Sequence, residues 1–140
     1  MRILVAEDNP VNQRVITVLL EKRGHSVSLA RNGSEAVDVF AKQPFDMIFM
    51  DVQMPIMNGY DASLAIRSAE RVTGFRTPII AVTAHAMKGD REQCLNAGMD
   101  DYLTKPVVVR DLDAMLKRFQ PEGPRNRAES DLLEVTMTTA

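Results

Sequence analysis

Three short, wholly apolar segments constrain the fold of this chain more than any other feature. They are residues 3–6, 47–50 and 79–82. None of them alternates between apolar and polar positions, and a strand without such alternation is buried on both faces, as in the parallel sheets of α/β proteins. The segments stop abruptly at polar side chains, at Glu7, Asp51 and Thr83 respectively. The sequence therefore predicts buried parallel strands whose carboxyl ends carry polar groups.

The segment after the first apolar run has the start and stop signals of a helix. Asn9 is a favourable N-cap, Pro10 suits the first helical position, and apolar residues recur at helical spacing until Gly24 offers a stop. Similar patterns predict helices near residues 36–40, 60–69, 90–97 and 112–119, and further strands at 26–30 and 101–103. Five strands that alternate with five helices form right-handed parallel units with helices on both faces of one sheet. The predicted fold class is doubly wound α/β.

Length and composition favour one domain with a polar tail. The chain has 140 residues, and the apolar pattern disappears from Pro121 onward, so we expect a domain at 1–120 and a tail or linker at 121–140. The net charge of −2 creates no general attraction to nucleic acid or to an anionic membrane, and neither is expected as a partner. A single cysteine, Cys94, cannot form an internal disulfide, which favours a cytoplasmic location.

The polar groups at the strand ends form the candidate site, because ligands of open α/β sheets bind beyond the carboxyl ends of the strands. These groups are Glu7, Asp8, Asp51, Thr83 and Lys105. If the first and third strands are neighbours, the three carboxylates converge. An oxygen-rich cluster suits a hard cation such as Mg²⁺, and a lysine with a threonine hydroxyl suits the charge of a phosphoryl group. The set predicts a site that phosphorylates an aspartate.

Each of these residues has an ordinary structural explanation when it is taken alone. Acidic side chains at strand ends often cap the following helix, a single threonine is most often a solvated loop residue, and a single lysine is usually a surface charge. Their occurrence together at the ends of four predicted strands favours the functional interpretation.

The motifs that contain these residues resemble the receiver domain of two-component response regulators, over nearly all of residues 1–120. The matching segments are Glu7-Asp8-Asn9, Met50-Asp51-Val52-Gln53-Met54-Pro55, Met57-Asn58-Gly59, Thr83-Ala84 and Tyr102-Leu103-Thr104-Lys105-Pro106. The resemblance implies a flavodoxin-like, five-stranded parallel sheet with strand order 2-1-3-4-5 and five helices. It also implies that Lys105-Pro106 is a cis peptide bond.

The resemblance assigns a role to each acidic residue. Asp51 is implied as the phosphoacceptor that attacks a phosphohistidine on a histidine kinase or a histidine phosphotransfer protein. Asp8 and Asp51 are implied as direct Mg²⁺ ligands, with Mn²⁺ able to substitute. The backbone carbonyl of Gln53 is implied as a further ligand, and Glu7 as an assisting group that acts through water. Glu7 departs from the commoner aspartate at its position, and a water-mediated contact absorbs the extra methylene.

The resemblance also implies a conformational switch. Thr83 is expected to move toward the phosphoryl oxygen, with Tyr102 following inward and Lys105 completing the catalytic group. The face made by the fourth helix, fifth strand and fifth helix would then change, because phosphate stabilises one of two existing arrangements. The first helix is the family's usual docking surface for partners, and we expect a monomer or a weak homodimer.

Three segments are most similar to receivers attached to hybrid histidine kinases. They are residues 9–12, 83–87 and 97–102. Such receivers pass the phosphoryl group to a histidine phosphotransfer domain.

Two other functions compete with phosphoacceptance. A phosphatase of the haloacid dehalogenase type also uses an aspartate at a strand end, but it needs a second aspartate two residues on, where this chain has Gln53. A receiver-like interaction module that is never phosphorylated remains as the alternative, although such a module has no physical need for the cluster. No nucleotide-binding motif occurs, so we do not expect ATP use or a conventional enzyme.

Overall fold

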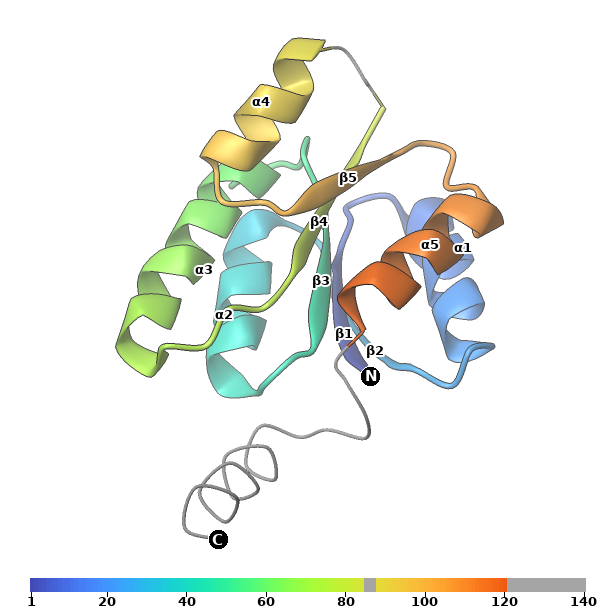
Figure 1. Cartoon of the computed structure of the whole chain (residues 1–140), viewed down its shortest axis with the longest axis horizontal. Coiled ribbons are helices and arrows are strands. Elements are labelled where there is room, and N and C mark those ends of the chain that lie inside the picture. The colour runs from blue at the N-terminus through green and yellow to red at the C-terminus, as the bar shows by residue number, and fades with distance from the viewer. Residues whose placement is uncertain (85–87, 121–140) are drawn as a thin grey trace, which may run out of the picture.

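The computed structural model of the chain describes residues 1–84 and 88–120. Five parallel strands form one sheet in the order β2-β1-β3-β4-β5, which confirms the predicted fold class and strand order. The elements are β1 (Arg2–Ala6), α1 (Pro10–Glu21), β2 (Ser26–Ala30), α2 (Gly33–Lys42), β3 (Met47–Asp51), α3 (Gly59–Thr73), β4 (Ile79–Thr83), α4 (Lys88–Asn96), β5 (Asp101–Thr104) and α5 (Val109–Phe119). Figure 1 shows the sheet between α1 and α5 on one side and α2, α3 and α4 on the other.

The helices cover both faces of the sheet because the central strands are apolar on both sides. Every residue of β3 and β4 is buried. One core cluster joins alternate strand residues, such as Leu4 and Ile48, to residues of α2, α3 and α4. The other cluster joins the intervening strand residues, such as Ile3 and Phe49, to α1 and α5. The unalternating apolar runs thus divide between two cores, as expected for strands buried on both faces.

Asparagine caps fix where three helices begin. Asn9 accepts hydrogen bonds from two backbone N–H groups in the first turn of α1. Asn32 and Asn58 do the same for one N–H group each at α2 and α3. These side chains satisfy donors that a helix start leaves unpaired. Since each cap follows a strand end closely, all three helices start near the carboxyl edge of the sheet.

The loop between β3 and α3 lies tightly against its surroundings. The Gly59 N–H donates to the Val52 carbonyl at 2.9 Å. A Cβ atom on Gly59 would overlap the backbone carbonyl of Asp51, and one on Gly33 would lie 2.5 Å from the Met57 carbonyl oxygen. Only glycine permits these approaches, and they hold the loop directly behind Asp51.

The ends of several elements differ slightly from the predicted ones. Asp51 and Thr83 form hydrogen-bonded strand ends instead of following their strands, and α3 extends to Thr73. Within residues 1–84 and 88–120, no helix has the length and apolar character required to cross a bilayer. The predicted tail at 121–140 and residues 85–87 of the 83–87 segment lie outside the described residues, so the boundary after residue 120 stays a prediction.

Candidate metal centre

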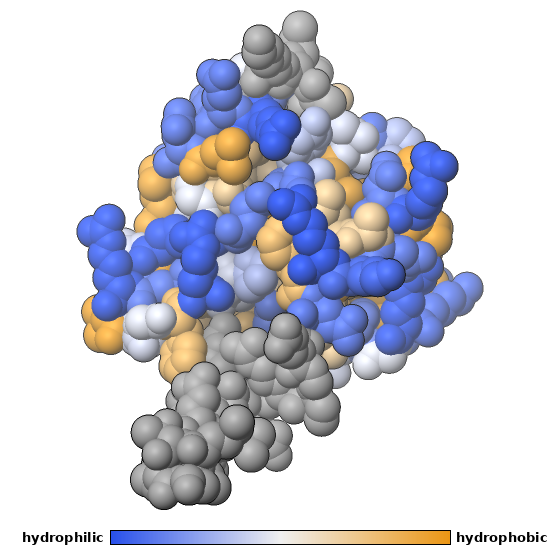
Figure 2. Space-filling model, in the orientation of Figure 1, coloured by the Kyte–Doolittle hydropathy of each residue, from blue (hydrophilic) through white to orange (hydrophobic). Residues whose placement is uncertain are grey.

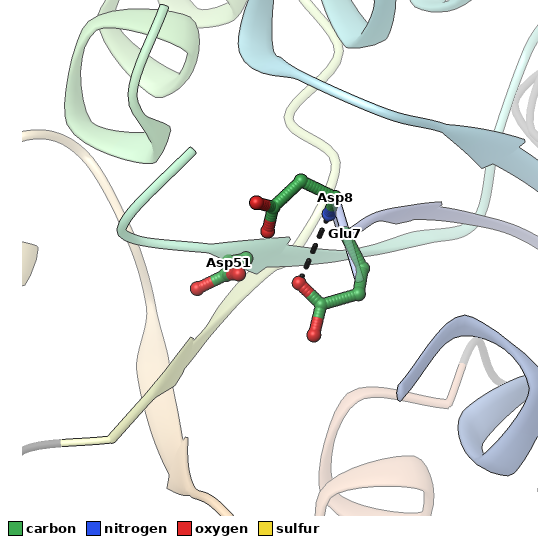
Figure 3. Close-up of side chains that lie close together, drawn as sticks. All are labelled: Glu7, Asp8 and Asp51. Carbon is green, nitrogen blue, oxygen red and sulfur yellow. Dashed lines mark hydrogen bonds between the residues drawn. The ribbon is translucent and has the colours of Figure 1, made fainter. Parts of the chain in front are cut away.

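Strand pairing brings three carboxylates together at the carboxyl edge of the sheet. β1 and β3 are parallel neighbours with Ala6 opposite Met50, so the residues that follow β1 lie beside the end of β3. Glu7, Asp8 and Asp51 each offer a carboxylate oxygen within 4.8 Å of the others. Figure 3 shows the three side chains around one small space, with the Asp8 N–H donating to Glu7. The predicted convergence required the first and third strands to be neighbours, and β1 and β3 are neighbours.

The three carboxylates differ in their access to solvent. Glu7 is 5% exposed and Asp51 is 3% exposed, whereas Asp8 is exposed. The cluster is therefore closed on its inner side and open toward Asp8. Such an arrangement suits Mg²⁺, which binds one or two protein carboxylates and keeps several waters.

Lys105 lies against the two buried carboxylates. Its Nζ is 2.9 Å from Asp51 Oδ2 and 3.1 Å from Glu7 Oε1. The Lys105 N–H donates to the Thr83 carbonyl at 2.8 Å, and this bond continues the pairing of β4 with β5 beyond the last strand residue. The peptide bond between Lys105 and Pro106 is cis, as the resemblance implied.

One lysine does not neutralise this group of carboxylates. Burial and a hydrogen bond with Glu7 raise the pKa of Asp51 to about 7, against the opposing effect of Lys105. Burial also disfavours ionisation of Glu7, but hydrogen bonds from Asp51 and Lys105 outweigh it and lower the pKa of Glu7. The raised pKa of Asp51 means that ionisation of this carboxyl is disfavoured here, so the site favours added positive charge.

A polar cleft of about 600 Å³ opens beside the carboxylates, between the β3–α3 loop and α4. Its lining includes Asp8, Gln53, Thr83, Tyr60 and Asp90. Thr83 is 6% exposed at the end of β4, so a largely buried residue borders the cleft. The cleft is large enough for a phosphoryl group and water at the exposed side of the cluster.

Gln53 and Tyr102 occupy different surroundings. The Gln53 N–H donates to Asp51 Oδ1 at 3.2 Å, which orients the carboxylate from the loop behind it. Tyr102 is half-buried on β5, opposite Ala81, and packs against the core beneath α3 and α4. It lines a separate hollow between α4, β5 and α5, together with Arg91. Tyr102 is thus placed between the core and that outer face.

Sequence reasoning missed two residues of α1 that contact the acidic turn. The Gln13 side chain donates to the Glu7 carbonyl oxygen at 2.5 Å. Asn12 forms a hydrogen bond with the Glu7 side chain that contributes to its lowered pKa. Both residues lie in the first turn of a predicted helix directly after the acidic pair, and this position could have indicated that they contact it.

Comparison with known proteins identifies one family. Residues 3–117 match the family described as the response regulator receiver domain. The chain is 50% identical over 111 residues to hybrid signal transduction histidine kinase I of Dictyostelium discoideum, with 76% of the chain and 6% of that protein covered. It is 43% identical over 121 residues to the signal transduction histidine-protein kinase BarA of Escherichia coli K12, with 86% and 13% covered. The chain therefore spans only a small part of these relatives.

Two solved structures are similar in fold and sequence. One is the receiver domain of the sensor histidine kinase PA1611 from Pseudomonas aeruginosa PAO1, which has a magnesium ion coordinated in its active site cleft. It has a TM-score of 0.77, 47% identity, and coverage of 84% of this chain and 95% of that one. The other is a co-crystal of the Saccharomyces cerevisiae phosphotransfer protein Ypd1 with the receiver domain of Ssk1. Here the TM-score is 0.81 at 35% identity, with coverage of 85% and 88%.

Proposed function

The chain belongs to the response regulator receiver domain family, and we propose that it accepts a phosphoryl group onto Asp51 from a phosphohistidine on a histidine kinase or a phosphotransfer protein. A receiver domain is a signalling module of two-component and phosphorelay systems. The site also fits hydrolysis of the resulting acyl phosphate, so the domain would limit the lifetime of its own signal.

One observation carries this proposal. Three carboxylate oxygens from Glu7, Asp8 and Asp51 lie within 4.8 Å of one another, while the Lys105 ammonium is 2.9 Å from Asp51. A structural ion pair would not require a third carboxylate, and close like charges are costly without a cation. The cluster is difficult to explain in a domain that is never phosphorylated, which was the alternative function.

The donor set fits Mg²⁺, with Mn²⁺ as a substitute. We propose that Asp8 and Asp51 bind the ion directly, that Glu7 assists through water, and that the Gln53 carbonyl oxygen contributes. All of these donors are oxygens, which suits a hard divalent cation. A bound cation would supply positive charge for the phosphoryl oxygens during transfer. The magnesium ion in the PA1611 receiver supports this assignment, because that domain is 47% identical to the chain.

The transfer exchanges one bond for another at phosphorus. An oxygen of Asp51 attacks, the bond between phosphorus and the donor imidazole nitrogen breaks, and that nitrogen keeps the electron pair. Lys105 already contacts Asp51 Oδ2 and would offer its ammonium to the phosphoryl oxygens as charge spreads over them. Its two present contacts hold it beside the reacting carboxylate, so little reorganisation is needed.

Thr83 and Tyr102 would convert the new phosphoryl group into a surface change. Thr83 borders the cleft beside Asp8, so a hydrogen bond from its hydroxyl to a phosphoryl oxygen would require only a local movement. Tyr102 lies on the adjacent strand, next to the hollow between α4, β5 and α5. Movement of Thr83 would let Tyr102 turn inward, and the shape of that face would change.

Partner binding would use the apolar side of α1. Val11 is 70% exposed, Val15 is 48% exposed and Val18 is 40% exposed, all at helical spacing. They line a shallow groove together with Leu29 of β2. The phosphotransfer protein in the Ssk1 co-crystal supports a partner of this class. The similarity to hybrid kinases supports a place within, or beside, such a kinase, and the cytoplasmic location stays a prediction.

Mass spectrometry of the intact protein with acetyl phosphate tests the assignment. The native chain should gain the mass of one phosphoryl group only when Mg²⁺ is present, and Asp51→Asn should gain none. Asp38→Asn, on the exposed face of α2, is the matched control and should be modified like the native chain. Absence of modification under saturating donor and Mg²⁺ would favour the phosphorylation-independent module.

A further inference from the structure

The loop between β3 and α3 contains an unusual backbone conformation. Ile56 has a φ of 70°, the only positive φ outside glycine among residues 1–84 and 88–120. The Met57 N–H donates to the Pro55 carbonyl at 2.7 Å, which closes a three-residue turn around Ile56. Turns of this kind are rare and strained, and a β-branched residue at positive φ is a genuine outlier. Ile56 is therefore an energetically unfavourable choice at this position.

Packing does not compensate for this strain. The Ile56 side chain is 84% exposed, and neither core cluster of the described residues includes it. Single exposed apolar residues are common on proteins, and Figure 2 shows small apolar patches scattered among hydrophilic residues. The exposure alone would need no explanation. An exposed apolar side chain on a strained backbone does, because glycine would adopt the same conformation without strain.

The turn itself is imposed by contacts on both sides of the loop. The Met57 carbonyl accepts a hydrogen bond from the Gly33 N–H at 2.9 Å, at the start of α2. On the other side, the Gly59 N–H is bonded to Val52, directly after Asp51. These contacts require a particular backbone path and make no demand on the side chain at position 56. The isoleucine side chain must therefore be explained by something outside the loop.

The position of the loop indicates what kind of molecule could contact the Ile56 side chain. Pro55 and Met54 line the cleft that also contains Asp8 and Thr83, so the turn forms part of the cleft's rim. Figure 1 shows the loop beyond the carboxyl end of β3, where a phosphohistidine must approach. A protein that brings this group to Asp51 has to cover the rim. An apolar contact there would help to exclude water from the reacting groups.

We propose, on the basis of the function proposed above, that Ile56 is an apolar anchor for the protein that carries the phosphohistidine. The anchor would set the affinity of the encounter without taking part in the chemistry. It would occupy an apolar patch on the partner beside the phosphorylated histidine. Strain at a functional loop is retained when the surroundings determine the backbone, as they do here.

Phosphotransfer from phosphorylated yeast Ypd1, compared with phosphorylation by acetyl phosphate, tests this inference. Ile56→Asn keeps a side chain that tolerates positive φ but removes the apolar surface, and Ile56→Gly removes both the surface and the strain. Val72→Asn is the matched control, because Val72 is 90% exposed near the end of α3.

Both Ile56 variants should fold and should react with acetyl phosphate and Mg²⁺ at the native rate. Transfer from Ypd1 should fall roughly 5 to 30-fold in both, as for loss of an interface anchor, and Val72→Asn should transfer like the native chain. The ratio of the native transfer rate to the variant transfer rate should change little with salt concentration, since the contact is apolar. The inference would be overturned if the Ile56 variants and the native chain accepted the phosphoryl group from Ypd1 at equal rates. It would also be overturned if acetyl phosphate modified the native chain but Ypd1 transferred nothing to it. Failure of acetyl phosphate to modify Asp51 would instead count against the proposed function.

Discussion

Two partly buried groups of charges lie at opposite ends of the strands, and they differ in how well the charges are balanced. At the amino ends of β4 and β5, the Arg67 side chain donates to Gly98, Glu70, Thr77 and Asp100 over distances of 2.5 to 2.9 Å. At the carboxyl edge, one lysine faces three carboxylates. Both groups contain carboxylates beside a cation, but only the first has as many cations as carboxylates.

The balanced network has the features of a structural element. Asp100 also accepts hydrogen bonds from Arg76 and the Ile79 N–H, and Glu70 accepts one from the Thr77 N–H at 2.6 Å. Two arginines, Arg67 and Arg76, thus face two carboxylates in this network. The unbalanced cluster has an aspartate whose pKa is raised to about 7. Charge imbalance, rather than burial of charge, therefore distinguishes the cluster to which we assign phosphorylation from the structural network.

Removal of Arg67 should have the largest effect on stability. Arg67→Met would leave the buried Glu70 and the partly buried Asp100 without their main cation, and breaking a buried pair of this kind costs about 3–5 kcal/mol. Urea denaturation followed by circular dichroism would measure the loss. The site chemistry should survive in the folded fraction, so phosphorylation by acetyl phosphate is the control. A loss below about 1 kcal/mol would contradict the structural role given to this network.

Asp51→Asn should stabilise the fold in metal-free buffer at pH 8, whereas Arg67→Met should destabilise it. Because the folded-state pKa of Asp51 is about 7 against an ordinary value of 3.8, native stability falls as the pH rises between these values. The variant lacks this penalty, so its melting temperature should exceed the native one at pH 8 and approach it near pH 4. Thermal melts at both pH values, with Asp38→Asn as control, measure the difference. A variant less stable than the native chain at pH 8 would refute the claim that ionised Asp51 destabilises the metal-free fold.

Mg²⁺ should stabilise the native chain by a smaller amount. A ligand that binds only the folded state at ten times its dissociation constant adds about 1.4 kcal/mol. Melts with and without Mg²⁺ should show this shift in the native chain and in Arg76→Gln, but not in Asp8→Asn. An equal shift in Asp8→Asn would place the ion elsewhere.

Arg76→Gln should have the smallest effect. The Arg76 side chain is 60% exposed, and Asp100 keeps Arg67 and the Ile79 N–H when Arg76 is removed. An exposed ion pair contributes roughly 0 to 1 kcal/mol, so urea denaturation should show a loss within that range. A loss as large as that of Arg67→Met would mean that the two arginines do not play the different roles described here.

The fold could be predicted because its signals are local. Unalternating apolar runs and the cap formed by Asn9 with Pro10 each reflect the immediate backbone. The strained turn at Ile56 could not be predicted in this way, since contacts from Gly33 and Gly59 impose it. The contacts of Asn12 and Gln13 with Glu7 are local, but they were missed because they depend on the side-chain orientations in the first turn of α1.

The sequence by itself determined which groups stand at the strand ends, because hydrophobic periodicity fixes where each strand stops. Only the tertiary structure decided that Glu7, Asp8 and Asp51 share one space, since this requires β1 and β3 to be neighbours. The tertiary structure also decided that the pKa of Asp51 is raised while that of Glu7 is lowered. A pKa depends on burial and on charges within a few ångströms, and these distances exist only after residues 7, 51 and 105 have been brought together.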